Sequence, residues 1–137
     1  MRRPAACLLA ALPALTLAAC GKQSEPERVR SAVEGFAEAT RTQDYQRICD
    51  DLLSHELVAT VEEAGLPCEL AVRRGLEGTK APALEIQTIA VREGRASVGV
   101  RSTAEGQKPS DDVLELVREG DDWRISALAQ PRTAPRR

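Results

Sequence analysis

The side chains suited to acid–base chemistry are few in this chain. His55 is the only histidine, Tyr45 the only tyrosine and Trp123 the only tryptophan among 137 residues. An acid–base enzyme needs a general base and an oxyanion donor that face a dry pocket. Histidine is the residue type most often used for acid–base chemistry near neutral pH, so these three residues are the candidates for lining such a pocket. The simpler interpretation places His55 in solvent at a helix start and Tyr45 in the core with its hydroxyl at the rim.

The acidic residues have simpler interpretations than catalysis or metal binding. Asp44 is suited to capping a helix. Asp50-Asp51 is suited to a solvated helix edge, because neighbours in a helix point about 100° apart. The pairs Asp111-Asp112 and Asp121-Asp122 lack the alternating oxygen ligands of a calcium loop. We therefore expect no metal and no cofactor.

A leader segment precedes the rest of the chain. Two arginines near the start are followed by an apolar run at residues 5–18. A positive start, an apolar run and small residues before a cut are typical of a secretory signal. Leu17-Ala18-Ala19-Cys20, followed by Gly21, resembles the lipobox of bacterial lipoproteins, in which the cysteine is acylated with diacylglycerol. The resemblance implies a signal peptide at residues 1–19 and a protein anchored to the cell membrane, outside the cytoplasm, through Cys20.

Two other interpretations of the leader remain open. A transmembrane helix needs about 20 apolar residues, whereas the run at residues 5–18 is shorter and contains Pro13 and Thr16. An ordinary cleaved signal would leave Cys20 as a free thiol. We expect the lipid anchor, and no membrane-spanning helix in the mature chain.

The chain has four cysteines. If Cys7 belongs to the signal peptide and Cys20 carries the lipid, Cys49 and Cys68 remain. An exported protein meets an oxidising environment, so we predict a disulfide between them. A structural zinc site needs four nitrogen or sulfur ligands, and a thioredoxin-type site needs Cys-x-x-Cys. Neither pattern is present. On the chain-entropy account, closing a loop of roughly 20 residues stabilises a fold by about 3 kcal/mol.

The mature chain is the size of one small domain. Removing residues 1–19 leaves 118 residues, which are enough for one domain and not two. They carry 17 basic and 21 acidic residues, a net charge of −4. This mildly negative charge argues against a nucleic-acid partner, which requires a basic surface to neutralise phosphates.

The first half of the mature chain has the pattern of helices. Residues 20–26 form the lipidated cysteine and a short linker, and helical periodicity starts at Glu27 with Val29, Val33, Phe36, Ala37 and Thr40 on one face. Further helices are expected after Asp44, after Ser54 and at Pro67, the last ending near residues 75–78. The predicted disulfide would join the second helix to the fourth.

The second half has the pattern of strands, at residues 84–92, 95–103, 112–118 and 122–128. In the first strand the apolar residues change from even to odd positions, and one face stays inward only if an extra residue is inserted. We therefore predict a β-bulge at Gln87-Thr88. The last strand places Trp123 and Ile125 on one face. Residues 129–137, which hold two prolines and three arginines, are expected to form a disordered tail.

Helices followed by an antiparallel meander predict an α+β domain with helices over one face of a bent sheet. Residues 33–39, Asp44-Tyr45, Ile48-Cys49 and Leu52-Leu53-Ser54 resemble the helical start of small actinobacterial-type lipoproteins with an NTF2-like domain. Residues 116–125, which end in Trp123-Arg124-Ile125, are similar to the closing hairpin of the same superfamily. The resemblance covers residues 27–128 and implies a cone-shaped half-barrel that encloses a pocket between helices and sheet.

The functional expectation is a binding module. No position matches the superfamily's catalytic acid–base residues, so we expect a non-enzymatic binding or interaction module at the cell envelope. Its partners would be membrane lipid through Cys20 and a small apolar ligand or an envelope protein. The alternative is an isomerase or dehydratase acting on a small hydrophobic molecule, and a third hypothesis is a purely structural lipoprotein subunit. Tyr45 and His55 within hydrogen-bond reach in an enclosed cavity would favour the enzyme, whereas a filled or purely aliphatic interior would favour binding or scaffolding.

Overall fold

The computed structural model describes residues 21–129. The predicted signal peptide, the lipidation site Cys20 and residues 130–137 of the predicted tail lie outside this range. The elements are α1 (Glu25–Thr42), α2 (Tyr45–Arg47), the π-helical turn η1 (Ile48–Leu52), α3 (His55–Glu63), α4 (Cys68–Gly75), β1 (Ala83–Arg92), β2 (Arg95–Thr103), β3 (Ser110–Glu119) and β4 (Asp122–Ala129). Within the described range, no helix combines the length and the apolar character that a membrane span requires.

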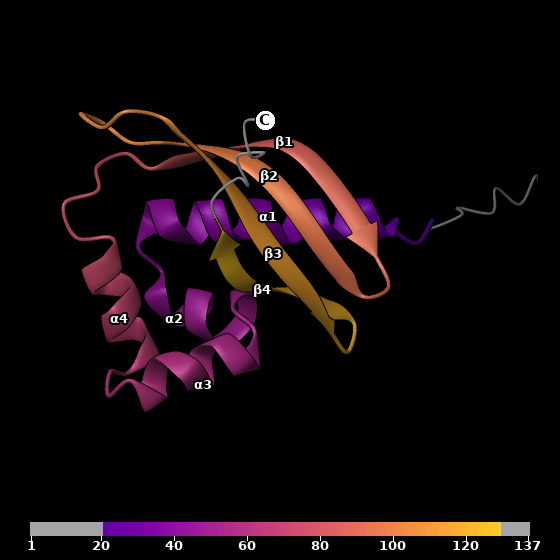
Figure 1. Ribbon diagram of the computed structural model, residues 1–137, viewed down its shortest axis with the longest axis horizontal. Helices are drawn as coiled ribbons and strands as arrows, with labels where there is room; N and C mark the ends of the chain where they lie inside the picture. The colour runs from indigo at the N-terminus through magenta and orange to yellow at the C-terminus, as the bar shows by residue number, and fades with distance from the viewer. Residues whose placement is uncertain (1–20, 130–137) are drawn as a thin grey trace, which may run out of the picture.

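The four strands form one antiparallel sheet in the order β1-β2-β3-β4. The long helix α1 runs across one face of this sheet, and α2, α3 and α4 gather at one side of it (Figure 1). The predicted α+β class, with helices on one face of an unclosed sheet, is confirmed. The core lies between α1, η1 and the inner face of the sheet, and its large buried side chains include Val29, Val33, Ile48, Val98, Val100, Leu114, Leu116, Trp123 and Ile125.

Helix α1 begins two residues earlier than the predicted start at Glu27. The backbone N–H of Ser24 donates to the Glu27 carboxylate at 2.7 Å, which completes a capping box around the first turn. Pro26 occupies this turn, where a proline is tolerated because the first N–H groups have no helical partner. The predicted linker at residues 20–26 therefore ends at Ser24 in the structure.

The predicted bulge in β1 is confirmed. Ile86 pairs with Val100 and Thr88 with Gly99, which leaves Gln87 without a partner in β2. A second bulge, which was not predicted, lies in β4, where Leu116 pairs with Ile125 but Glu115 pairs with Ala127. The same signal was present there, because the apolar positions of β4 change from odd at Trp123 and Ile125 to even at Leu128. Both bulges keep the apolar side chains on one face of a sheet that bends.

The second predicted helix is correct in position but not regular. Asp44 caps it by accepting a hydrogen bond from the N–H of Arg47 at 3.1 Å, as expected. After one turn the helix widens into η1, which closes with the N–H of Leu53 bonded to the carbonyl of Ile48 at 2.9 Å. The chain then runs beside β4, where Leu53 forms a parallel bridge with Ile125. This contact covers part of the β4 edge, and sequence periodicity carried no sign of it.

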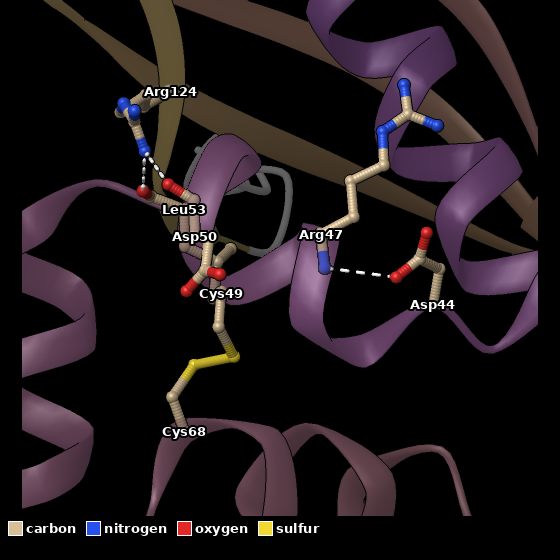
Figure 2. The surroundings of a disulfide bond; sticks show 7 residues. All are labelled: Asp44, Arg47, Cys49, Asp50, Leu53, Cys68 and Arg124. Carbon is tan, nitrogen blue, oxygen red and sulfur yellow. Dashed lines mark hydrogen bonds between the residues drawn. A yellow bond between two sulfur atoms is a disulfide. The ribbon is translucent and has the colours of Figure 1, made fainter.

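The disulfide between Cys49 and Cys68 is present and joins η1 to the first residue of α4, with their Cα atoms 6.1 Å apart. Figure 2 shows Arg124 reaching from β4 toward η1. Its guanidinium donates to the carbonyl of Asp50 at 2.7 Å and that of Leu53 at 3.3 Å. These contacts supply donors to carbonyls that the end of a helix leaves unpaired. The disulfide therefore holds η1 to α4, and the hydrogen bonds of Arg124 hold η1 to the sheet.

Candidate functional site

An apolar hollow of about 240 Å³ lies where the C-terminal half of α1 meets the open end of the sheet. Its apolar wall includes Phe36 of α1, Leu84 of β1, Leu114 of β3 and Leu128 of β4. Leu128 is 70% exposed and is the one large apolar side chain within residues 21–128 that stands in solvent. The hollow therefore has an apolar wall, polar side chains along its border and an aliphatic residue at its rim.

Two loops border this hollow. One is the connection from α4 to β1, which contributes Leu76, Thr79 and Pro82, and the other is the turn between β2 and β3. The N–H of Glu105 in that turn donates to the carbonyl of Lys80 at 2.8 Å, so a backbone hydrogen bond holds the loops together. Ala81 has a φ of 46°, a left-handed conformation that a non-glycine residue adopts rarely.

Several polar side chains border this hollow, and Thr40 is the buried one among them; the others are Thr79, Ser102, Thr103, Gln107, Lys108, Ser110 and Asp112. Thr40 is only 9% exposed, and its hydroxyl oxygen makes no hydrogen bond within the described part of the chain. It also borders a neighbouring hollow of about 310 Å³, which is lined by Tyr45 and by part of the α4–β1 connection. The signal for Thr40 was visible in the sequence as a hydroxyl on the apolar stripe of α1, but its free hydroxyl was not predictable.

Tyr45 lies outside the apolar hollow. It is half-buried, and the guanidinium of Arg73 lies 5.7 Å from the centre of its ring, within the range of a cation–π contact. This contact joins α2 to α4, alongside the disulfide. The position matches the interpretation of Tyr45 as a residue at the edge of the core.

His55 lies far from both hollows. Its side chain is 80% exposed, and its Nδ1 lies 2.7 Å from a carboxylate oxygen of Glu119. Glu119 is the last residue of β3, whereas the apolar hollow reaches Ser110 at the first. A strand of this length spans about 30 Å, so His55 and the hollow lie toward opposite ends of the sheet. The structure does not bring Tyr45 and His55 together.

Trp123 is buried in the wall of a third hollow, of about 380 Å³, beside the first turns of α1. Its indole N–H donates to the Glu25 carboxylate at 2.9 Å. The hollow is lined with charged side chains from α1, η1 and the β3–β4 turn, including Arg28, Asp51 and Asp121. Trp123 therefore joins α1 to β4 in a polar surface hollow, apart from the aliphatic one.

Shifts in pKa occur at exposed ion pairs and caps. Hydrogen bonds from Ser24 lower the pKa of Glu27, and a hydrogen bond from Arg41 lowers the pKa of Glu38. A hydrogen bond from Arg101 lowers the pKa of Asp111. None of these three carboxyl groups lines the apolar hollow. Among residues 21–128, no three His, Cys, Asp or Glu side chains converge as a metal site would require.

The comparisons with known proteins identify the fold. No protein-family model and no curated protein sequence matches the chain. A solved structure from Streptomyces avermitilis, a candidate dehydratase of the NTF2-like family, matches with a TM-score of 0.54 and 15% identity, over 79% of this chain and 96% of its own. An NTF2-like protein of unknown function from Shewanella baltica matches with a TM-score of 0.52 and 10% identity, over 74% of this chain and 88% of its own. The chain has the NTF2-like fold.

A third NTF2-like protein of unknown function, from Silicibacter pomeroyi, matches with a TM-score of 0.52 and 16% identity, over 74% of this chain and 90% of its own. Identities this low establish a shared backbone arrangement and not a shared activity. In this NTF2-like fold the apolar hollow lies at the C-terminal end of α1 and the open end of the sheet, beside a filled core. The features that point to function are therefore those of the hollow itself.

Proposed function

We propose that this protein is a membrane-anchored bacterial lipoprotein whose NTF2-like domain binds a small apolar ligand without catalysing a reaction. The observation that carries the proposal is the apolar hollow bordered by Phe36, Leu84 and Leu114, with Leu128 exposed at its rim. Covering an exposed apolar side chain with an apolar ligand removes its surface from water, which lowers the free energy. The two acid–base candidates, Tyr45 and His55, contact Arg73 and Glu119 instead of the hollow.

The start of α1 supports a short tether. Because the helix begins at Glu25, the chain from an acylated Cys20 to the domain would extend at most about 17 Å. Thr40 lies 15 residues further along the same helix, which corresponds to about 22 Å. The tether would hold the N-terminal end of α1 near the bilayer and leave the mouth of the hollow at the other end of the helix.

The alternative function is an isomerase or dehydratase acting on a small hydrophobic molecule. The observation in its favour is Asp112, which borders the hollow and accepts a hydrogen bond from Ser110 at 2.8 Å. Lys108 also borders the hollow, on the loop before β3. An enzyme would use Asp112 as its base, and replacing it with asparagine would abolish turnover while leaving ligand retention intact.

Native mass spectrometry of the full chain extracted from its own membrane tests the proposal. The expected species lacks residues 1–19, carries diacylglycerol on Cys20, retains the Cys49–Cys68 bridge and holds a small molecule that dissociates on activation. A Leu128→Ser variant should hold less of this molecule. Ala127→Ser is the matched control, because Ala127 is an exposed β4 neighbour outside the hollow. Recovery of an uncleaved, reduced chain from the cytosol would contradict the proposal.

A further inference from the structure

Helix α4 lies at the edge of the molecule and has few attachments to it. Its main neighbours are α2, α3 and η1, which are themselves short (Figure 1). Cys68 is its one buried residue, and the side chains that follow Cys68 are half-buried or exposed. Within the described residues, no backbone hydrogen bond and no ion pair joins α4 to another helix or strand. The disulfide is therefore the strongest attachment of α4.

The residues that follow α4 form part of the wall of the apolar hollow. Leu76 and Thr79 both line it. The N–H of Leu76 donates to the carbonyl of Val72 in α4, and the N–H of Thr79 donates to the carbonyl of Leu76, both at 3.0 Å. These bonds continue the end of the helix, so the positions of Leu76 and Thr79 depend on the position of α4. Lys80, further along, is bonded to the β2–β3 turn instead.

Without the disulfide, little holds α4 in place. A helix of eight residues is not stable alone. It would keep the cation–π contact of Arg73 with Tyr45 and the packing of a few half-buried apolar side chains. Releasing the helix would return backbone and side-chain entropy to all of its residues. We therefore expect reduction to free α4 together with Leu76 and Thr79, which removes this wall from the hollow.

The disulfide borders a surface hollow of its own. Cys49 and Cys68 are 8% and 5% exposed, and both line a hollow of about 370 Å³ at the surface of η1, α3 and α4. Reduction by a dithiol transfers two electrons and two protons, leaves two cysteine thiols and converts the dithiol into a disulfide. Formation of the bridge is the reverse reaction, in which the disulfide of a thiol–disulfide oxidoreductase accepts the electrons.

We propose that the Cys49–Cys68 disulfide is a redox latch for the apolar hollow. The oxidised latch fixes α4 and the wall formed by Leu76 and Thr79, and the reduced latch releases both. A ligand in the hollow would lose part of its buried contact area on reduction, so the oxidised protein binds it more tightly. The inference deepens the proposed binding function and rests on it. The chain would then acquire its binding site only after export, where disulfides form and persist.

The first measurement is hydrogen exchange in the oxidised full chain, in the same protein reduced with dithiothreitol, and after reoxidation. We expect reduction to accelerate exchange in residues 68–79 by on the order of a hundredfold, the effect of loop closure if all of it is local. Exchange in α1 and in the sheet should change little, and reoxidation should restore slow exchange. A variant with both Cys49→Ser and Cys68→Ser should behave as the reduced protein does.

Gly99→Ala is the matched control for a general loss of stability. It places a Cβ atom 2.5 Å from the Thr88 hydroxyl oxygen, within the sheet, and leaves the disulfide intact. Position 99 does not line the apolar hollow. We expect this variant to exchange faster throughout the sheet, without the selective acceleration of residues 68–79.

The second measurement is the binding of N-phenyl-1-naphthylamine, an apolar dye that fluoresces when it leaves water. We expect reduction to weaken its binding by about tenfold, because part of the contact area in the hollow is lost. Leu128→Ser should weaken dye binding to the oxidised protein, whereas Ala127→Ser should not. This comparison establishes that the dye occupies the apolar hollow.

Each contrary outcome has a distinct meaning. Unchanged exchange in residues 68–79 after reduction would overturn the latch, and so would acceleration spread evenly over the sheet. Selective acceleration of residues 68–79 with unchanged dye affinity would overturn the link to the hollow and leave the binding function standing. No dye binding to the oxidised protein would overturn the proposed binding function, while exchange would still show whether the disulfide holds α4.

Discussion

At the scale of single residues, the most consequential side chain is one that carries an unused hydrogen-bonding group. Thr40 occupies a position in α1 where a valine would fit the apolar stripe, which already holds Val29 and Val33. Its hydroxyl is paired with no described atom. A buried hydroxyl without a partner has lost its contacts with water and gained none in exchange, so it is unfavourable for the folded state.

This interpretation predicts a stability gain from removing the hydroxyl. Thr40→Val should raise the free energy of unfolding of the ligand-free protein by about 1 kcal/mol, since it removes a buried and unsatisfied polar group. Urea denaturation of both proteins, with tryptophan fluorescence as the probe, measures the difference. Thr42→Val should give no such gain, because the Thr42 hydroxyl is exposed and bonded to a backbone carbonyl. A loss of stability in Thr40→Val would contradict the prediction.

A second residue-scale feature is the absence of a side chain at Gly99. Gly99 faces Thr88 directly across the β1 bulge. A Cβ atom added to Gly99 would lie 2.5 Å from the Thr88 hydroxyl oxygen and 3.7 Å from its Cβ. The Thr88 hydroxyl oxygen is therefore the group that requires glycine at position 99, and the backbone does not require it.

Gly99→Ala should lower the free energy of unfolding by about 1–3 kcal/mol, the usual range for an overpacked site. The same substitution in a Thr88→Ala background should lower it much less, because the clashing oxygen is gone. A double-mutant cycle measured by urea denaturation gives the coupling between the two positions. Additive effects would show that the crowding at this bulge is not the cause.

At the scale of elements, the helical region depends on cross-links more than on its own periodicity. α2 has three residues and η1 has five, and helices this short are not stable alone. The disulfide, the Arg124 contacts to Asp50 and Leu53, and the Leu53 bridge to β4 hold this region in place. α4 in turn is attached through Cys68.

Replacing both Cys49 and Cys68 with serine should lower the free energy of unfolding by about 3 kcal/mol, the value of closing a loop of this length. The loss should be largest in α2, η1 and α4, where hydrogen exchange should become faster than in the sheet. Exchange measured by mass spectrometry with and without reductant tests both statements. Uniform acceleration across the sheet would mean that the bridge supports the whole domain instead.

At the scale of the whole molecule, the first turn of α1 is joined to the last hairpin of the sheet. Glu25 accepts the indole N–H of Trp123 at 2.9 Å and lies 3.5 Å from the guanidinium of Arg118. These partners are more than 90 residues away in the chain. The end of the domain next to the proposed tether is therefore closed by contacts between its two termini.

Glu25→Ala should lower the free energy of unfolding by about 1–2 kcal/mol, because it leaves the buried indole N–H without an acceptor. It should also shift the fluorescence of Trp123, since this is the only tryptophan in the chain. Glu25→Gln keeps an acceptor and should retain most of the stability. Equal losses in the two variants would indicate that the charge of Glu25, through Arg28 and Arg118, matters more than the hydrogen bond.

The order of apolar and polar side chains along the chain was enough to predict the helices and strands. It was also enough to predict a local irregularity wherever the irregularity changes that order. The parity change between Ile86 and Ile89 located the β1 bulge, and the Asp44 and Ser54 caps began their helices as predicted. The Ser24 capping box was missed because Glu27 was taken as the first residue of the helix, whereas it is the third. The β4 bulge was missed although Leu128 carried the same signal.

The candidate site was less accessible to sequence reasoning. The predicted pocket residues were Tyr45, His55 and Trp123, because their side chains are chemically distinctive. The chemistry of a side chain does not determine whether it lies beside a pocket. The hollow is built from Phe36, Leu84, Leu114 and Leu128, which are ordinary apolar residues on four different elements. Only the folded arrangement shows which of many such residues surround empty space.

The sequence alone determined the class of the fold, the two cysteines that pair and the face that each long element turns inward. These properties follow from periodicity and cysteine number, which are local or countable. The tertiary structure decided where the unpaired hydroxyl of Thr40 lies, which residues surround the apolar hollow and how far His55 lies from it. Such features arise from packing between segments distant in the chain, where a gap of a few ångströms separates a filled core from a binding site.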